Sequence, residues 1–581
     1  MFKLVLGSIR EYKKQSIATP LLVSVEVVLE CIIPFVIAQL VNQIKAGCDF
    51  GTIALYGGAL ILMAGLSLLF GTLAGLTCST ASAGLAKNLR KDMFYAIQGF
   101  SFENIDKFSA SSLVTRLTTD VTNVQMAYMM IIRTAIRSPL MLIFAFTMAF
   151  VMGGKMALIY LFIAPVLLFG LILIARKVMP LFRRVFKKYD NLNGSIQENV
   201  KAMRVVKSYV REDYEKQKFG KAAEEVRADF TKGERILALN SPIMMFCLYA
   251  LMIFVMTVGS KTIITTHGTA LDVGQFSALL TYGMMILMSL MMLSMVFVML
   301  TMAAESCKRI NEVLTEKSTL HSPDDPVYTL ADGSIDFEDV SFKYDPALKY
   351  SALSHIDLHI ASGQTVGIIG GTGSSKSTLV QLISRLYDAT EGTVKVGGRN
   401  VKEYDLDALR RQVAMVLQKN ILFSGTIKEN LRWGNKEATD EQLIEACKLA
   451  QAHDFITAFP DGYDTRIDQG GANVSGGQKQ RLCIARALLA QPKVLILDDS
   501  TSAVDTHTDA LIRKGLREYL PDTTKLIIAQ RTASVEDADM ILVMDGGRIA
   551  ASGTHSQLMQ SCDVYREIYI SQNKAGKDHE E

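Results

Sequence analysis

The segment from residue 365 to residue 387 changes its periodicity at a glycine-rich turn. Before the turn, TVGIIG is typical of a short buried strand. After it, Leu379, Ile383 and Leu386 follow one another at helical spacing. The turn GTGSSKST presents backbone N–H groups to an anion, and the N-terminus of the following helix favours negative charge. The sequence therefore predicts a phosphate-binding loop that joins a strand to a helix.

Two polar side chains at the start of this helix extend the expected chemistry from phosphate to metal. Lys376 can reach the terminal phosphates of a nucleotide, and the hydroxyl of Ser377 can hold Mg²⁺. The strict motif has glycine where Ser375 stands, and serine keeps the backbone N–H but restricts the backbone. The remaining residues predicted to surround the phosphates are Gly370, Gly371, Thr372, Gly373, Ser374 and Thr378.

A second candidate for anion binding begins at Ser475, in the segment NVSGGQKQRLCIARALL. Ser475 is suited to cap a helix, and Gly476 and Gly477 leave the start of that helix open to an anion. Alone, such a segment indicates only a turn. It becomes specific because VLILDD follows, an apolar strand that ends at Asp498, where a carboxylate can meet the metal ion of a bound nucleotide. KLIIAQ then supplies a further strand.

These motifs occupy the second half of a chain of 581 residues, which is too long for one compact domain. Hydrophobic residues make up 49% of the chain, and the long apolar runs are confined to its first half. Each run approaches the ~20 residues that a membrane-spanning helix requires. The six runs lie at residues 17–44, 53–85, 129–152, 156–178, 236–260 and 274–302. With a net charge of +3, the chain gives no electrostatic reason to expect nucleic-acid binding.

Basic residues distinguish the two sides of the predicted membrane. They cluster before the first run and after the second and fourth, whereas the other three connections hold one each: Lys45, Lys155 and Lys261. Because positive charge is retained in the cytoplasm, both termini and the two long connections are predicted to be cytoplasmic. The clusters contain Lys3, Arg10, Lys13 and Lys14, then Lys87, Arg90, Lys91, Lys107 and Arg116, and finally the basic residues from Arg176 through Arg235.

The two cytoplasmic connections, for example 104–121 and 199–219, are charged, helical in pattern and too long for ordinary loops. We expect the membrane helices to continue into the cytoplasm and to turn at tips that can touch a soluble domain; a solvated helix without a partner is the alternative. The predicted division is a transmembrane domain at 1–310, a linker at 311–333, an α/β domain at 334–573 and a charged tail at 574–581.

The ordered set of motifs resembles the ATP-binding cassette (ABC) exporters, and the resemblance covers nearly the whole chain. It implies a membrane domain of six α-helical spans followed by an α/β P-loop nucleotide-binding domain, the ATP-binding cassette at 334–573, with ATP and Mg²⁺ as cofactors. GGTGSSKST corresponds to the Walker A loop, VLILD to Walker B, VSGGQ to the signature and SAVD to the D-loop.

The same resemblance assigns roles to single residues. Tyr344 is similar to the aromatic residue that stacks on adenine, and Gln418 to the glutamine that links the nucleotide to the membrane domain. It implies that Ser377, Gln418 and Asp498 hold the magnesium ion. The signature residues, implied to contact ATP bound to a partner chain, are Ser475, Gly476, Gly477 and Gln478.

Two departures from the family pattern fall on one nucleotide site. The family's catalytic base after Walker B is glutamate, and here Asp499 is shorter by one methylene. A displacement of about 1 Å can cost about 100-fold in rate. The family's switch histidine is replaced by Gln530, which can hydrogen-bond a phosphate but carries neither a proton nor a charge. We therefore expect this chain to resemble the degenerate half of the bacterial heterodimeric multidrug exporters, with a second homologous half-transporter as its partner.

Candidate substrate contacts lie in the first and last apolar runs. Glu26 and Glu30 are one helical turn apart, and ionisable groups in a span are functional candidates. They could attract cationic amphipaths, or pair with Arg133 or Arg137. Methionines near one face of the last run offer adaptable contacts, although methionine also fills gaps in packing. These methionines are Met284, Met288, Met291, Met295 and Met299.

The combined prediction is a multi-pass subunit of an ATP-driven exporter in the plasma (cell inner) membrane. Its partners would be the second chain, the lipid bilayer and hydrophobic or amphipathic small molecules as substrates. A lipid flippase or a peptide exporter would share every nucleotide motif and differ only in its cavity. A non-transporting regulatory module gated by ATP is the third possibility, because a weak site can bind nucleotide without driving movement.

Overall fold

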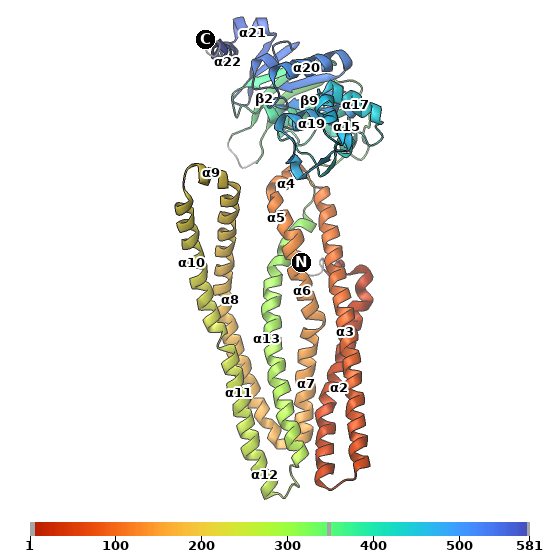
Figure 1. The fold of residues 1–581 in the computed structure, drawn as a ribbon, viewed down its shortest axis with the longest axis vertical. Coiled ribbons are helices and arrows are strands. Elements are labelled where there is room, and N and C mark those ends of the chain that lie inside the picture. The colour runs from red at the N-terminus through yellow and green to blue at the C-terminus, as the bar shows by residue number, and fades with distance from the viewer. Residues whose placement is uncertain (1–5, 346–349, 578–581) are drawn as a thin grey trace. The chain divides into compact units, whose positions relative to one another are not determined.

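The structure, a computed structural model, describes residues 6–345 and 350–577 (Figure 1). Lys3 and the end of the predicted tail, residues 578–581, lie outside the described residues. The chain divides into two compact units. The first, the helical unit, comprises Met1–Gln98 and Ser109–Glu316, and the second comprises Gly99–Phe108 and Lys317–Glu581. The division falls inside the linker predicted at 311–333, and the second unit takes in a short piece of the first cytoplasmic connection.

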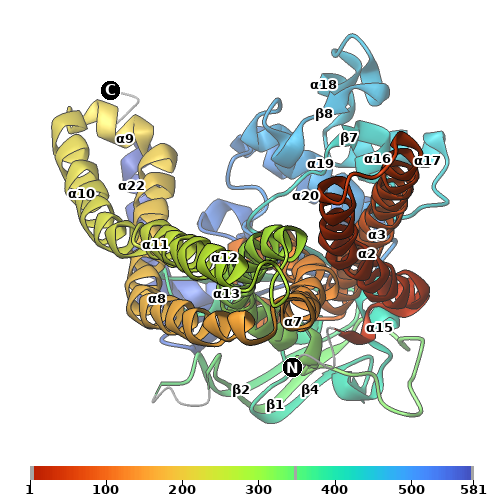
Figure 2. The same ribbon diagram turned by 90° about the horizontal axis from the view of Figure 1, so that it is seen from below.

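Long helices build the helical unit, interrupted by short 3₁₀ and π-helical turns. In chain order they are η1 (Arg10–Tyr12), α2 (Lys13–Lys45), α3 (Phe50–Gln98), α5 (Ala110–Thr115), η2 (Arg116–Asp120), α6 (Val121–Ile132), α7 (Thr134–Gly153), η3 (Gly154–Ala157), α8 (Leu158–Lys201), α9 (Met203–Ser208), α10 (Glu212–Leu237), α11 (Asn240–Phe254), η4 (Val255–Gly259), α12 (Ser260–Thr265) and α13 (Val273–Thr315). Figure 2 shows α2 with α3 on one side of α7 and α13, and α8 with α10 and α11 on the other.

Close backbone approach and buried hydroxyl groups hold α13 to its neighbours. A Cβ atom at Gly274 would lie 2.1 Å from the carbonyl oxygen of Ala38, so only glycine permits this contact between α13 and α2. The Tyr282 hydroxyl donates to the carbonyl oxygen of Cys31 at 2.8 Å, and both residues are buried. Small residues and paired hydroxyls of this kind replace the hydrophobic effect as the packing force where lipid surrounds the helices.

By length and composition, five helical stretches of the described chain qualify as membrane spans. They are Arg10–Lys45, Phe50–Gln98, Ala110–Phe182, Glu212–Thr265 and Val273–Thr315. The predicted count of six is therefore not confirmed. The difference arises because the third and fourth predicted spans fall together within Ala110–Phe182, where the chain reverses at η3 (Figure 1). Gly154, at φ +50° and ψ −122°, takes a conformation at this reversal that only glycine adopts readily.

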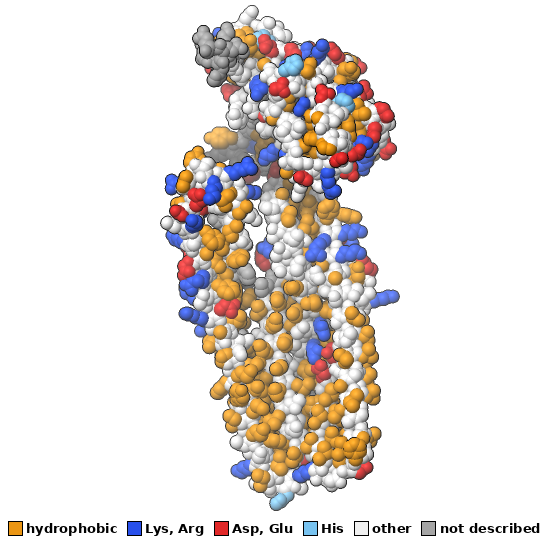
Figure 3. Space-filling model, viewed as in Figure 1, with side chains coloured by type: hydrophobic (Ala, Val, Ile, Leu, Met, Phe, Trp, Pro, Cys, Tyr) orange, Lys and Arg blue, Asp and Glu red, His pale blue; other side chains and the backbone are white. Residues whose placement is uncertain are grey.

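The surface of the helical unit separates into an apolar belt and a charged part. In Figure 3 hydrophobic side chains cover the half around α7, α11 and the lower turns of α2 and α3, whereas Lys, Arg, Asp and Glu gather around α9 and α10. The helical and charged character predicted for the two long connections is present: α5 and η2 lie in the first, and α9 and α10 in the second. Helices α3 and α8, of 49 and 44 residues, are therefore longer than the ~20 residues that a membrane-spanning helix requires.

Two large sheets and one two-stranded sheet, β7-β8, organise the second unit. A four-stranded antiparallel sheet has the order β2-β1-β4-β5, and a six-stranded, mostly parallel sheet has the order β12-β11-β3-β10-β9-β6. The strands are β1 (Ile335–Phe342), β2 (Leu353–Ile360), β3 (Thr365–Gly370), β4 (Glu391–Val396), β5 (Arg399–Asn400), β6 (Val413–Val416), β7 (Gly425–Thr426), β8 (Arg466–Ile467), β9 (Val494–Asp498), β10 (Thr524–Ile528), β11 (Met540–Asp545) and β12 (Arg548–Gly553). Strands β3, β9 and β10 are parallel neighbours, so their carboxyl ends meet at one edge.

Helices cover these sheets and connect them. They are α4 (Phe102–Phe108), α14 (Lys376–Ile383), η5 (Val401–Glu403), α15 (Leu406–Gln412), α16 (Ile427–Leu431), α17 (Asp440–Leu449), α18 (His453–Thr457), η6 (Gly462–Asp464), η7 (Gln469–Gly471), α19 (Gly476–Leu489), α20 (Thr506–Tyr519), η8 (Thr532–Ser534), α21 (His555–Ser561) and α22 (Asp563–Lys577). Helix α14 is shorter than predicted. It ends at Ile383 because Arg385 takes a left-handed conformation, at φ +49°, so Leu386 lies beyond the helix.

Candidate nucleotide-binding site

The phosphate-binding loop predicted from the sequence lies between β3 and α14. All but the last residue of β3 are buried, so the strand fixes the start of the loop. A Cβ atom at Gly370 would lie 2.1 Å from the carbonyl oxygen of Met544, which requires glycine there. Ser375 has φ +68° and ψ +27°, the left-handed conformation that glycine adopts without strain. Serine therefore takes the shape that the strict motif requires, at a conformational cost of about 1–2 kcal/mol.

Lys376 lies folded over the loop. Its Nζ donates to the carbonyl oxygens of Gly370 and Gly371 at 2.9 and 2.8 Å, and lies 3.3 Å from Ser374 Oγ. Burial lowers the pKa of Lys376. The ammonium group is thus held at the centre of the loop, where a phosphate oxygen would be a better partner than neutral carbonyl groups.

Two of the three side chains predicted to hold magnesium, Ser377 and Asp498, lie within hydrogen-bond distance of each other. Ser377 Oγ donates to Asp498 Oδ1 at 3.0 Å. Burial raises the pKa of Asp498, which is 3% exposed. A hydroxyl and a carboxylate are the oxygen ligands that Mg²⁺ prefers, and a divalent cation would stabilise the buried carboxylate. The residues present therefore fit Mg²⁺ bound together with nucleotide phosphates.

The two residues that depart from the family pattern are joined directly. Gln530 Nε2 donates to Asp499 Oδ2 at 2.8 Å, and Gln418 Nε2 lies 3.5 Å from the same oxygen. Asp499 is 9% exposed and has φ +48°, a conformation uncommon for a residue with a side chain. Its carboxylate is therefore engaged by neutral amides rather than directed freely at a water molecule.

The signature segment forms the helix start that the sequence predicted. Ser475 precedes α19, and its Oγ accepts from the backbone N–H of Gln478 at 3.3 Å. In return Gln478 Oε1 accepts from the backbone N–H of Ser475 at 2.9 Å, completing a reciprocal capping box. These bonds fix the first turn of α19, while the N–H groups of Gly476 and Gly477 are not used by the box.

Sequence analysis missed how the signature helix is tied to the D-loop. Gln480, which is buried, donates through Nε2 to Ser502 Oγ at 3.2 Å and accepts from the backbone N–H of Ala503 at 2.9 Å. A Cβ atom at Gly477 would lie 2.8 Å from the Ala503 carbonyl oxygen. A glutamine on the apolar face of α19 was the available signal, because a buried amide requires partners.

Contacts of two tyrosines, Tyr344 and Tyr387, connect the start of α14 to helix α4. The Tyr344 hydroxyl lies 3.0 Å from Thr378 Oγ1, and its ring meets that of Tyr387 at 5.3 Å between centroids. The Tyr387 hydroxyl donates to Asp106 Oδ2 of α4 at 2.7 Å. Asn104 Nδ2 also donates to the carbonyl oxygen of Lys317 at 3.2 Å. Helix α4, which belongs to the second unit, therefore contacts the rest of that unit through Tyr387, a residue that sequence analysis did not single out.

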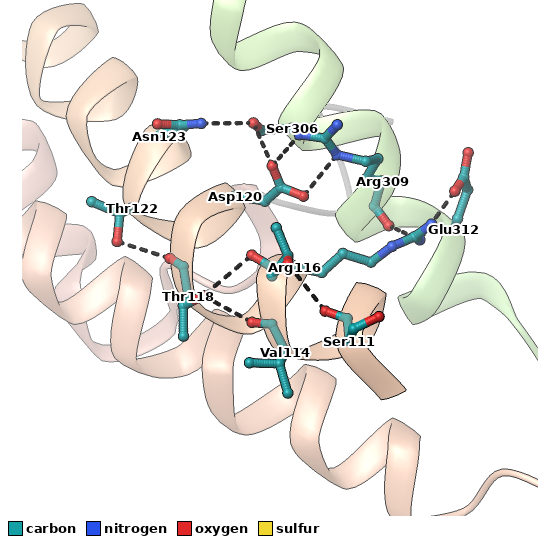
Figure 4. A network of polar contacts seen from close by, with 11 residues as sticks. Ser111, Val114, Arg116, Thr118, Asp120, Thr122, Asn123, Ser306, Arg309 and Glu312 are labelled. Carbon is teal, nitrogen blue, oxygen red and sulfur yellow. Dashed lines mark hydrogen bonds and ion pairs between the residues drawn. The ribbon is translucent and has the colours of Figure 1, made fainter. Parts of the chain in front are cut away.

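A polar network inside the helical unit joins the rest of the first connection to α13 (Figure 4). Asp120 is fully buried and accepts from Ser306 Oγ at 2.9 Å and from Arg309 Nε at 2.8 Å. Arg116 Nη1 donates to the carbonyl oxygen of Arg309 at 2.7 Å and pairs with Glu312 at 3.0 Å. Because Asp120 is buried and paired twice, η2 and the end of α13 are held together as one piece.

Of the substrate candidates, the acidic pair has a partner within the chain. Arg137 of α7 donates from Nη1 to Glu26 Oε1 at 2.7 Å and from Nη2 to both oxygens of Glu30 at 2.8 Å. The pairing alternative is therefore correct for Arg137. The methionines of α13 are divided: Met284, Met288 and Met295 are exposed in this single chain, whereas Met291 packs against the core of the helical unit.

Comparison with known proteins places both units in one class. Residues 17–291 match the model of the ABC transporter transmembrane region, and residues 353–502 match that of the ABC transporter ATP-binding domain. The chain is 35% identical over 552 residues to the uncharacterized ABC transporter ATP-binding protein YfiB of Bacillus subtilis, covering 95% of each chain. It is 33% identical over 570 residues to a Mycobacterium tuberculosis protein of the same description, MT1311, covering 97% of each.

The fold agrees with these sequence matches. A bacterial Atm1-family ABC exporter with ATP bound superposes with a TM-score of 0.82 at 23% identity, over 97% of this chain and 99% of the other. Fold and site define a membrane protein with an ATP-binding cassette. The chain belongs to the ABC transporter family, as a half-transporter with one transmembrane and one ATP-binding domain, and this class couples ATP hydrolysis to transport.

Proposed function

We propose that this chain is one subunit of a heterodimeric exporter of hydrophobic or amphipathic small molecules. In this proposal it supplies a degenerate ATP site and the signature of a competent site. The observation that carries the proposal is the 2.8 Å hydrogen bond from Gln530 to Asp499. It joins the two altered positions, and it stands beside a signature whose capping box is complete.

The proposed chemistry at this chain's own Walker motifs is nucleotide retention. Lys376 and the loop N–H groups would hold phosphates, and Ser377, Gln418 and Asp498 would hold Mg²⁺, which screens phosphate charge. Asp499 is a poor general base, because its carboxylate is short and already accepts a hydrogen bond from Gln530. Gln530 cannot supply the positive charge that a protonated histidine would bring to the γ-phosphate.

The signature of this chain would act on ATP held by the partner. Ser475 and the open N–H groups of Gly476 and Gly477 form a helix start suited to a γ-phosphate. Gln480 would fix that helix start relative to the D-loop. We further propose Tyr344 as the adenine-stacking residue, which requires its ring to present a face beyond its contact with Tyr387.

For the membrane part we propose six crossings with both termini in the cytoplasm, in the plasma membrane. The reversal at η3 divides the stretch Ala110–Phe182 into two crossings. The exposed methionines Met284, Met288 and Met295 support a substrate surface on α13, because thioether side chains adapt to varied apolar ligands. A lipid flippase or peptide exporter would use the same nucleotide chemistry and remains the second candidate.

The test compares the purified chain alone with the chain co-purified with a related half-transporter that has glutamate and histidine at the two positions. We expect the chain alone to bind ATP with Mg²⁺ and to hydrolyse it very slowly, and the pair to hydrolyse it at a rate that transported compounds stimulate. Rapid hydrolysis by the single chain would contradict the proposal. Hydrolysis by the pair without transport in vesicles would instead indicate a regulatory module.

A further inference from the structure

A cavity of about 670 Å³ opens between α2 and α3 in the helical unit. This volume is in the range that accepts a small ligand. The residues that line this cavity include charged, polar and small side chains as well as apolar ones. Those that matter for recognition are Glu26, Glu30, Ser67, Gly71, Thr72 and Arg133.

The ion pair with Arg137 leaves one carboxylate oxygen of this wall without a donor. Glu26 is 5% exposed, and Arg137 donates only to its Oε1. Glu26 Oε2 is buried and accepts no hydrogen bond from any described residue. On the side of α3, a Cβ atom at Gly71 would lie 3.0 Å from Glu26 Oε1, so the carboxylate is held closely against the helix. An unpaired carboxylate oxygen in such surroundings is costly unless a ligand donates to it.

In the same cavity, the guanidinium group of Arg133 has no hydrogen-bond acceptor or anionic partner among the described residues. Its side chain lines the cavity, and among the described residues no ion pair or hydrogen bond to its guanidinium is formed. A guanidinium is always charged and has only donors. The first apolar run begins at residue 17, so Glu26 lies about 13 Å along α2 from that end. Arg133 belongs to the third apolar run, residues 129–152. Both unpaired groups therefore lie within predicted membrane spans, where ionisable groups indicate a functional site.

We propose that this cavity binds a zwitterionic head group composed of a primary ammonium and a phosphate. The ammonium donates to Glu26 Oε2, and the phosphate accepts from Arg133. A simple cation would satisfy Glu26 but face the charge of Arg133, and a simple anion would satisfy Arg133 but face two carboxylates. A zwitterion satisfies both groups without changing the net charge of the site. The inference needs only that the helices lie in a bilayer, and it is independent of the proposed division of the ATP sites.

The first experiment measures lipid binding to the purified full chain by native mass spectrometry. Phosphatidylethanolamine, phosphatidylcholine and phosphatidylglycerol with identical acyl chains are titrated in turn. We expect phosphatidylethanolamine to bind about tenfold more tightly than the other two, because choline has no N–H to donate to Glu26 and glycerol carries no positive charge. Equal binding of all three lipids would overturn the proposal.

Two variants then test the assigned groups. Glu26→Gln should abolish the preference for phosphatidylethanolamine over phosphatidylcholine, and Arg133→Gln should weaken the binding of both about tenfold. Glu305→Gln and Arg235→Gln, at exposed positions of the same unit, are the matched controls and should bind like the parent. Unchanged selectivity in Glu26→Gln, or unchanged affinity for both lipids in Arg133→Gln, would overturn the proposal. If a variant fails to fold, the comparison of lipids on the parent chain still decides.

Competition with soluble phosphoethanolamine identifies the source of the head group. If millimolar phosphoethanolamine displaces the bound lipid, the cavity accepts a free zwitterion. If it does not, while the preference for phosphatidylethanolamine persists, the site requires the lipid itself. A failure of the ATPase predictions would leave all of these binding results unaffected, so the two proposals can fail separately.

Discussion

The nucleotide-binding domain has two helix starts suited to phosphate, and their local structures differ. Before α19, Ser475 has an extended backbone and shares a capping box with Gln478. Before α14, Ser375 is left-handed, and its side chain caps nothing. Asp499, on the same half of the domain as Ser375, is also left-handed. Departures from the family pattern thus fall on the half that we propose holds nucleotide, while the half that we propose faces a partner has a complete capping box.

This contrast in local structure leads us to expect that the two halves of one domain are not equally suited to catalysis. In a head-to-tail pair each nucleotide would meet the Walker motifs of one chain and the signature of the other. A change at Asp499 or Gln530 would then affect one site, and a change at Ser475 would affect the other. Variants placed on the two halves can therefore be compared within a single pair.

The largest effect is expected for Ser475→Arg. The new side chain would block the open N–H groups of α19 and lose both bonds of the capping box. Loss of a preorganised anion site typically costs about 10²–10³ in rate, so the ATPase activity of the pair should nearly disappear. The control, Gln560→Arg at an exposed position of α21, should leave the rate unchanged. Substantial residual activity would show that this signature does not serve the competent site.

The second prediction concerns a variant in which the family residues are restored at positions 499 and 530. In Asp499→Glu combined with Gln530→His, the carboxylate gains its missing reach and the switch position gains a group that can be protonated. ATP hydrolysis by the chain alone should rise about 100-fold, since a 1 Å misplacement costs about that much. Each single substitution serves as the comparison and should give far less than the double variant. No gain in the double variant would mean that the two positions do not limit this site.

Ser375→Gly addresses the loop itself and should have a smaller effect. Glycine adopts φ +68° without the strain that serine bears there, so the loop conformation should be more populated. We expect ATP to bind up to about fivefold more tightly in an equilibrium titration, corresponding to about 1 kcal/mol. Ser375→Ala is the control, because alanine at φ +68° keeps the strain that glycine relieves, and the serine side chain caps nothing that would be lost. Weaker binding by Ser375→Gly would show that serine contributes more than its backbone.

The smallest effect is expected for Asp499→Ala in the pair. If this carboxylate is not the working base, its loss removes only the hydrogen bonds from Gln530 and Gln418. The ATPase rate at saturating ATP should remain within about twofold of the parent, because these amides are exposed and can bond to water. A loss as large as that of Ser475→Arg would identify Asp499 as catalytic and reject the degenerate assignment.

The features that could be predicted from the sequence are those set by residues close together in the chain. Strands β3 and β9, the loop between β3 and α14, and the cap at Ser475 depend on residues close together in the chain. The early end of α14 was missed because a single left-handed residue, Arg385, overrides a helical apolar pattern.

Contacts between segments that are distant in the chain could not be predicted from the sequence. The bonds of Gln480 to the D-loop and of Tyr387 to Asp106 join residues whose proximity only the assembled fold creates. The pairing of Arg137 with both Glu26 and Glu30 was one of two alternatives before the structure, because charge alone does not specify which partner lies within reach.

Helix α3 runs without a break from Phe50 to Gln98, 49 residues in all. At 1.5 Å per residue it is a rod of about 74 Å, of which a bilayer covers only about 30 Å. A tilt of about 5° of this rod therefore moves the far end of the remaining ~40 Å by about 3.5 Å. That displacement exceeds the length of a typical hydrogen bond. A small change of angle among the apolar turns of α3 is therefore enlarged geometrically at its end, Gln98.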